Sequence, residues 1–282
     1  MEISKDKRFL TVKDHSVSKE TFDLYRDEIL DLVYTHPQPN EANLPKYYDS
    51  DDYISHTDGK RSLFEKAYQF VKNIALKNKL NLINSLQKSK GNLLDIGAGT
   101  GDFLVVAKEN GWQITGIEPS SKAKEIAIKK GIYFVEDSST VETNSIDVIT
   151  MWHVLEHVPN IENQIKELKR LLKPNGTILI AVPNFNSFDA QHYGHHWAAY
   201  DVPRHLWHFS KTAIQKLFEK EDMKLVDILP MKFDAFYVSL LSEKYQTGKM
   251  NYIKAFFIGL QSNWKGRQTK EFSSHIYVIK KL

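Results

Sequence analysis

Residues 93–104 read LLDIGAGTGDFL, and this stretch decides the fold. It opens with a short apolar run typical of a buried strand, continues with glycines at 97, 99 and 101, and leads into a helix-like segment. Glycine lets the backbone adopt a positive φ and approach a ligand with no Cβ in the way. The free N–H groups of a helix's first turn face the same place. The sequence therefore predicts a strand, a glycine turn and a helix that together form a nucleotide-sized binding edge.

The spacing of the glycines separates two kinds of nucleotide site. A dinucleotide fingerprint, G-x-G-x-x-G, would need a glycine at position 102, where this chain has Asp102. The pattern is instead D-x-G-x-G-x-G, which resembles the first motif of the class I S-adenosylmethionine-dependent methyltransferases. This resemblance implies S-adenosyl-L-methionine as the cofactor and S-adenosyl-L-homocysteine as its product. It also implies a cofactor site that includes Asp95, Gly97, Ala98, Gly99 and Gly101.

The next predicted strand supports the same interpretation. The segment WQITGIEPS, residues 112–120, is largely apolar and ends in Glu118 and Pro119. A carboxylate at the tip of the second strand can accept both ribose hydroxyls of a nucleoside. In the resembled family an acidic or polar residue after the third strand contacts the adenine; Glu136 and Asp137 are the candidates, and we favour Asp137. Trp152 and His153, at the end of the fourth strand, complete the expected cofactor site.

Length and composition limit the remaining possibilities. The 282 residues can bury one large core, and the net charge of +3 is too nearly balanced to indicate a nucleic-acid partner. The absence of cysteine excludes disulfides, thiolate catalysis and cysteine-ligated zinc. The N-terminal residues are polar, and no apolar stretch reaches the ~18–20 residues that span a bilayer. We therefore expect a cytoplasmic protein without stable membrane insertion, in an oligomeric state that the sequence does not define.

Strands and helices alternate from residue 92 to residue 182, which indicates an α/β fold with a mainly parallel sheet covered by helices on both faces. The family resemblance implies a Rossmann-like sheet of seven strands. We expect residues 1–60 to be an irregular, capping segment and residues 61–282 to be the methyltransferase domain, beginning with a long amphipathic helix. Two insertions, residues 183–209 and 231–272, would cap the carboxyl ends of the strands, where open α/β sheets bind ligands.

Histidines are concentrated between residues 153 and 208, which favours acid–base or metal chemistry. In MWHVLEHVPN, the side chains of His153, Glu156 and His157 would share one face of a helix. The LEHV motif resembles that of the ubiquinone-pathway O-methyltransferases, which use carboxylates with the histidine to bind a divalent metal. This chain has His153 where those enzymes carry a glutamate, which weakens the case for magnesium. We therefore expect no metal, and we assign His157 and His153 as catalytic candidates that line the cleft; a purely structural role is the remaining alternative.

The segment HYGHHWAAYDVPRHLWHFS, residues 192–210, offers rigid aromatic bodies with polar tips, as small-molecule pockets need. Its PRHL-x-HFS motif resembles a bacterial subgroup of class I methyltransferases in which this segment covers the active site; many members are associated with small molecules or surface-glycan precursors. Arg204 can pair with Asp201 or bind a phosphate or carboxylate. For His205 and His208 a structural role is equally compatible with the sequence, and Ser210 is expected to cap the following helix. The substrate-binding candidates are His196, Trp197, Arg204, His205, His208 and Tyr237.

Two further aromatic regions flank the predicted site. Tyr47, Tyr48, Tyr53 and His56 follow the N-terminal segment THPQP and are candidates to reach the cofactor pocket. The stretches AFYVSLLSEKY and NYIKAFFIGL of the second insertion are expected to form the core of a lid rather than a membrane-binding face, because few lysines flank them.

These observations lead to a functional hypothesis with alternatives. The leading one is a methyltransferase that acts on a small-molecule or glycan- or lipid-precursor acceptor, by O- or C-methyl transfer with a histidine base. One alternative is a non-catalytic, S-adenosylmethionine-binding regulatory protein. Another is a metal-assisted O-methyltransferase of a phenolic or quinone-like acceptor. Methylation of nucleic acid or protein is disfavoured by the balanced charge.

Overall fold

The computed structural model describes residues 7–40, 42–48, 63–87 and 89–281. Its central sheet has the strand order β5-β4-β6-β7-β10-β9. Strands β4 (Asn92–Ile96), β5 (Gln113–Ile117), β6 (Ile146–Trp152) and β7 (Leu172–Pro183) run parallel. The last strand, β10 (Ser274–Lys281), is antiparallel to both β7 and β9 (Met223–Pro230). The prediction of a Rossmann-like, mainly parallel α/β sheet is confirmed.

The strand count differs from the expected seven. The segment IYFVED, predicted to be the third strand, forms one isolated parallel bridge from Phe134 to Gly116. It lies beyond β5 at the edge of the sheet, where Tyr133 is exposed and the Phe134 ring covers the Cα of Gly116. Because one bridge does not make a strand, the described part of the chain has six strands in this sheet.

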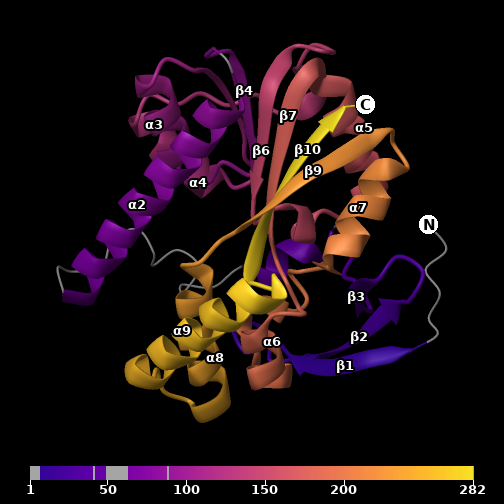
Figure 1. Ribbon diagram of the computed structural model, residues 1–282, viewed down its shortest axis with the longest axis vertical. Helices are drawn as coiled ribbons and strands as arrows, with labels where there is room; N and C mark the ends of the chain where they lie inside the picture. Colours follow the sequence, from indigo (N-terminus) through magenta and orange to yellow (C-terminus); the bar gives the residue numbers. More distant parts are fainter. Residues whose placement is uncertain (1–6, 41, 49–62, 88, 282) are drawn as a thin grey trace.

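Helices cover both faces of the sheet (Figure 1). On one face lie α2 (Leu63–Leu86), α3 (Asp102–Glu109) and α4 (Ser121–Lys129), and on the other α5 (Ile161–Leu171) and α7 (Lys211–Glu219). Neighbouring residues of one strand serve opposite cores: Leu93 packs with α2 and α3, and Leu94 packs with α5 and α7. Burial on both faces explains why these strands are continuous apolar runs.

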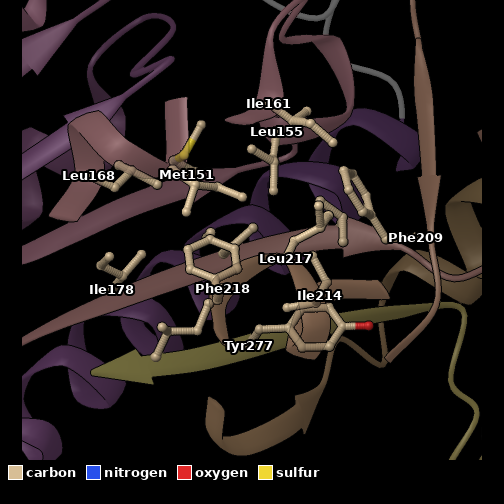
Figure 2. Packing of buried hydrophobic residues seen from close by; sticks show 14 of the residues in the cluster. Met151, Leu155, Ile161, Leu168, Ile178, Phe209, Ile214, Leu217, Phe218 and Tyr277 are labelled. Atoms are coloured by element: carbon tan, nitrogen blue, oxygen red, sulfur yellow. The ribbon is translucent and has the colours of Figure 1, made fainter. Parts of the chain in front are cut away.

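The core beneath α5 and α7 is dense and aromatic (Figure 2). Phe218 and Tyr277 are fully buried there, and Leu168 of α5 packs in the same cluster. Ser210 accepts a hydrogen bond from the Ala213 N–H and caps α7, as the sequence predicts.

The N-terminal segment is ordered where the sequence analysis expects irregular structure. Strands β1 (Arg8–Lys13), β2 (Thr21–Asp27) and β3 (Leu32–His36) form an antiparallel sheet that β8 (Trp207–Phe209) completes. The fourth strand comes from the histidine-rich insertion, far along the chain. No local pattern records that pairing, which is why this sheet was not expected.

Short helices and a helical hairpin complete the fold. Between β7 and β8 lie α6 (Phe188–Tyr193) and the 3-10 helices η4 (Gly194–His196) and η5 (Ala198–Tyr200). The hairpin of α8 (Asp234–Thr247) and α9 (Tyr252–Thr269) lies beyond the carboxyl ends of the parallel strands (Figure 1). The remaining 3-10 helices are η1 (Leu44–Tyr47), η2 (Ser138–Thr140) and η3 (Leu155–His157). No helix among the described residues is long and apolar enough to cross a membrane.

Candidate active site

The glycine loop connects the end of β4 to the start of α3. Gly97, Gly99 and Gly101 have φ values of +70°, +55° and +75°, a region that other residues rarely adopt. A Cβ on Gly97 would lie 2.3 Å from a methyl of Val154, so this glycine also permits close packing against the segment after β6. A Cβ on Gly99 would meet nothing within 4 Å. The space over Gly99, here called the cradle, is therefore open.

Glu118 faces this cradle from the end of β5. Its side chain is buried, and its two carboxylate oxygens accept the N–H of Gly99 at 2.7 Å and the N–H of Ser120 at 2.8 Å. The backbone thus holds the carboxylate at the tip of the second parallel strand, with Pro119 next to it. Each oxygen keeps a second lone pair, so the group fits a ribose diol. The N–H groups of Gly97 and Ala98 bind the Ile117 carbonyl and join the loop to the same strand.

Asp95 lies beneath the loop and is buried. Burial raises the pKa of its carboxyl to about 7, although Thr150 donates a hydrogen bond to it at 2.5 Å and the nearby charge of Lys79 opposes the rise. Lys79 projects from α2 over the ring of Trp152, 4.3 Å from the ring centroid, and its burial lowers its own pKa to about 8. Trp152 also packs edge-on against Phe103 of α3. Asp95, Thr150 and Lys79 are thus the polar groups beneath the glycine loop, and the ring of Trp152 packs against Lys79.

Asp102 and Asp137 have local structural roles. Asp102, which stands where a dinucleotide fingerprint needs glycine, binds Lys72 and Lys130 at 2.7 Å each. Asp137 is exposed and accepts the N–H of Ser139, which caps η2. Its proposed contact with adenine stays a prediction.

His153 is held between two carboxylates. Its Nδ1 lies 3.3 Å from Glu156 Oε1, and its Nε2 lies 3.0 Å from Asp234 Oδ2 of α8. A left-handed backbone, φ +58°, turns the chain here at the carboxyl end of β6. Burial by itself lowers the pKa of His153, but Asp234 and Glu156 outweigh it and raise the pKa to about 10. The imidazole is therefore a cation at neutral pH and has no lone pair with which to accept a proton.

His157 has different hydrogen-bond partners. Its Nδ1 lies 3.0 Å from the carbonyl oxygen of Arg204 and 2.9 Å from the hydroxyl of Tyr48. Since a carbonyl only accepts, Nδ1 carries a proton in the neutral ring, and Nε2 keeps the lone pair. This half-buried ring stands edge-on to that of His205, 4.5 Å between centroids.

Three groups converge at this point. A carboxylate oxygen of Glu156 and one ring nitrogen each of His157 and His205 lie within 4.8 Å of one another. Glu156 is buried, and its Oε2 has no hydrogen-bond partner among the described residues. The Nδ1 of His205 donates to the Ala199 carbonyl at 2.8 Å, and burial keeps the pKa of this histidine well below its usual value. The cluster thus combines one carboxylate with two imidazoles whose other ring nitrogens are anchored.

Several residues predicted to bind substrate are instead occupied within the fold. Arg204 is buried and binds Asp201, Ser16 and the carbonyl of Tyr47, so its fork is not available to a phosphate. Trp197 is buried and donates its indole N–H to Asp189 at 2.8 Å.

Besides His205 in the cluster, three further substrate-binding candidates lie in three different places. His208 is buried beside Thr35, and burial lowers the pKa of its imidazole to about 3. His196 lies beside His195, 3.9 Å between ring centroids, on the side of the N-terminal sheet rather than at the glycine loop. Tyr237 is 39% exposed on α8, one turn after Asp234. Tyr53 and His56 lie outside the described residues.

Sequence reasoning missed Lys79 and Thr150. Lys79 stands in the apolar stripe of α2, between Leu76 and Ile83, and a lysine inside such a stripe is a detectable signal. Thr150 lies in the middle of an apolar strand, where a buried hydroxyl needs a partner.

The glycine loop, Glu118 and the Glu156–His157–His205 cluster all lie in a part of the chain that matches a known family. Residues 66–228, more than half of the chain, match the family described as "Methyltransferase domain". The protein is thus a member of the class I S-adenosylmethionine-dependent methyltransferases, whose cofactor is S-adenosylmethionine.

Curated relatives agree with this assignment. The chain is 31% identical over 123 residues to the ubiquinone biosynthesis O-methyltransferase of Sodalis glossinidius, over 39% of this chain and 49% of that protein. It is 32% identical over 131 residues to the protein of the same name from Actinobacillus pleuropneumoniae, over 40% of this chain and 56% of that protein. The chain thus spans about half the length of the curated relatives that it matches.

Solved structures share the fold. Magnesium protoporphyrin IX methyltransferase from Synechocystis PCC 6803, with bound S-adenosylhomocysteine, superposes with a TM-score of 0.57 at 12% identity, over 86% of this chain and all of that chain. A methyltransferase from Thermotoga maritima gives a TM-score of 0.51 at 21% identity, over 77% of this chain and 94% of that chain. At these identities the likeness concerns the fold alone.

Proposed function

We propose that this protein transfers the methyl group of S-adenosylmethionine to a hydroxyl or an acidic carbon of a small-molecule acceptor, with His157 as the general base. The observation that carries the proposal is the pair of anchored groups at one sheet edge. Backbone N–H groups hold both carboxylate oxygens of Glu118, and Nε2 of His157, beside the segment that packs on Gly97, has no hydrogen-bond partner among the described residues.

The chemistry divides between cofactor and protein. When bound, the cofactor supplies an activated methyl on a sulfonium. Nε2 of His157 accepts the proton of the acceptor, and the nearby carboxylate of Glu156 stabilises the imidazolium that results. His205, kept neutral by burial, adds no repelling charge. His153 cannot take the base role while both of its nitrogens face carboxylates, so we assign it to positioning.

The test compares binding with turnover. S-adenosylmethionine and S-adenosylhomocysteine are titrated calorimetrically into wild type and His157→Gln, and conversion to S-adenosylhomocysteine is followed with a panel of phenolic, sugar and lipid-precursor acceptors. We expect His157→Gln to bind cofactor normally and to lose ~10²–10⁴-fold in turnover. His192→Gln, an exposed histidine on α6, is the matched control.

Unchanged turnover in His157→Gln would remove the base assignment. Cofactor binding without conversion of any acceptor would favour the non-catalytic, regulatory alternative. Absence of binding by wild type would overturn the proposal as a whole.

The Glu156–His157–His205 cluster favours a second candidate function, metal-assisted O-methylation. A carboxylate with two imidazoles suits zinc, manganese or iron better than magnesium. A divalent cation held there would polarise an acceptor oxygen. Dialysis against a chelator separates the two mechanisms: turnover that falls and returns with one added metal supports the metal, whereas unchanged turnover supports the base.

A further inference from the structure

We propose that the outer face of the α8–α9 hairpin docks on an anionic lipid membrane. This face carries exposed apolar and basic side chains, and the first turn of α8 contacts His153.

Helix α9 has its small residues on the buried face and most of its large apolar residues on the exposed face. Its buried positions carry small residues, namely Ala255, Gly259, Ser262 and Gly266. A Cβ on Gly259 would lie 3.0 Å from the Cα of Phe236, so the two helices approach too closely for larger side chains between them. Apart from Ile258, which packs against the core, the large apolar side chains of α9 are therefore exposed.

These outward side chains form one continuous stripe. Ile253, Phe256, Phe257, Leu260 and Trp264 recur at three- and four-residue spacing and are between 43% and 74% exposed. Four more apolar residues of the hairpin are between 38% and 54% exposed, namely Phe233, Tyr237, Met250 and Tyr252. Nine of the fourteen exposed large hydrophobic residues in the described chain thus lie on this hairpin. An apolar patch of this kind marks an interaction surface.

This arrangement corrects, for α9, the expectation that the aromatic stretches form the core of a lid. In α8, Leu240 is buried and Val238 packs against the core, as expected, but the buried positions of α9 carry small residues.

Charge identifies the partner. Residues 231–272 contain seven lysine and arginine residues against three acidic residues, a net charge of +4, whereas the whole chain carries +3. All three acids are engaged within the protein: Asp234 with His153, Glu243 with Lys254 and Glu271 with Lys211. Lys249 and Arg267 are exposed beside the apolar stripe. Aromatic residues flanked by exposed cations are typical of helices that lie in an anionic membrane interface.

The same charge disfavours a second copy of the chain. Two such faces brought together would place like charges opposite each other, which costs free energy. An anionic bilayer accepts both the aromatic stripe and the cations.

The proposed orientation on the membrane also indicates the kind of acceptor. Asp234, in the first turn of α8, binds His153 at the catalytic edge, and Phe233 next to it is 39% exposed. The hairpin would therefore place that edge close to the membrane, where an amphipathic, membrane-borne acceptor is found. This last step rests on the proposed function; membrane binding does not.

Vesicle flotation of the full chain tests the proposal without any methyl transfer. The probes are vesicles of phosphatidylcholine alone and vesicles of equal parts phosphatidylcholine and phosphatidylglycerol. We expect flotation with the anionic vesicles only, and a decrease as salt screens the charges.

Two double variants examine the two features separately. Ile253→Ser with Phe257→Ser removes apolar contact and should weaken binding by at least about tenfold. Lys249→Gln with Arg267→Gln removes two cations, each worth ~1 kcal/mol near such a surface, and should weaken binding about thirtyfold. Ile29→Ser with Tyr133→Ser changes two residues of similar exposure elsewhere and should leave binding unchanged.

Circular dichroism and thermal unfolding confirm that each variant folds. No flotation of wild type with anionic vesicles would overturn the proposal, as would equal losses in the variants and the control. A wild-type dimer in sedimentation that Ile253→Ser with Phe257→Ser converts to monomer, without vesicle binding, would show that the face binds a second copy instead.

Discussion

The cofactor edge and the histidine cluster lie side by side, but they are built in opposite ways. The cofactor edge comes from one short stretch, in which β4, the glycine loop and β5 place Asp95, Gly99 and Glu118 together. The histidine cluster, Glu156 with His157 and His205, is held by groups from distant segments. Tyr48 comes from the N-terminal segment, Arg204 from the histidine-rich insertion, and Asp234 of α8 binds His153 beside the cluster.

This difference has physical consequences. The cofactor edge depends on backbone conformation, which adjacent residues determine. The histidine cluster depends on side-chain contacts between distant segments, held by Arg204 and the two ion pairs of His153. We expect a substitution at the cofactor edge to affect only neighbouring residues. A substitution in the histidine cluster should instead destabilise the contacts between several distant segments.

The largest effect is expected from Arg204→Met. This change leaves the carboxylates of Asp14 and Asp201 without their buried cation and should lower the free energy of unfolding by about 3–5 kcal/mol. Chemical denaturation measures the loss. Arg170→Met, which removes a more exposed pair with Glu167, is the control and should cost about 1 kcal/mol or less. Equal losses in the two variants would show that Arg204 does not hold the segments together.

Next comes the pair Gly97→Ala and Gly99→Ala. Both place a side chain at positive φ, which costs about 1–2 kcal/mol, and Gly97→Ala adds a clash with Val154 for a total near 3 kcal/mol. Thermal unfolding should therefore show the larger loss in Gly97→Ala. Titration with S-adenosylhomocysteine should show weakened affinity in Gly99→Ala, because its new Cβ enters the open cradle. The reverse order of stabilities would contradict the loop geometry.

Glu118→Ala examines the cofactor contact itself. Loss of hydrogen bonds to a charged acceptor should weaken S-adenosylmethionine about a hundredfold, close to 2.8 kcal/mol. Isothermal titration measures the change, with Asp222→Ala, an exposed acid that pairs with Lys169, as the control. Retention of affinity in Glu118→Ala would mean that the ribose lies elsewhere.

A further effect concerns pH. Because the pKa of His153 is raised to about 10 in the folded protein from the ordinary value of 6.5, its ion pairs stabilise the fold fully below pH 6.5. That stability is lost as the pH rises through about 10. The free energy of unfolding of wild type should therefore fall more steeply across this range than that of His153→Gln. Parallel curves for the two proteins would show that His153 is not held as a cation.

The sequence was a good guide to the parts of the site that are local. The D-x-G-x-G-x-G pattern and the acid that ends the next strand predict Gly97, Gly99 and Glu118 as cofactor contacts. The structure places all three at one edge of the sheet, and their contact with the cofactor stays a prediction. It was a poorer guide to roles within the histidine-rich segment. Arg204 and Trp197 have the chemistry of ligand contacts, yet buried partners occupy both side chains.

The sequence alone determined the α/β class, the glycine loop and the helices around the sheet, because hydrophobic periodicity and glycine conformation are properties of adjacent residues. Only the tertiary structure decided that the N-terminal strands pair with β8, that His153 lies between two carboxylates whereas His157 lies against a carbonyl, and that α9 turns its aromatic face outward. These outcomes depend on which distant carboxylate, carbonyl or helix lies against each residue, and no short-range pattern records that.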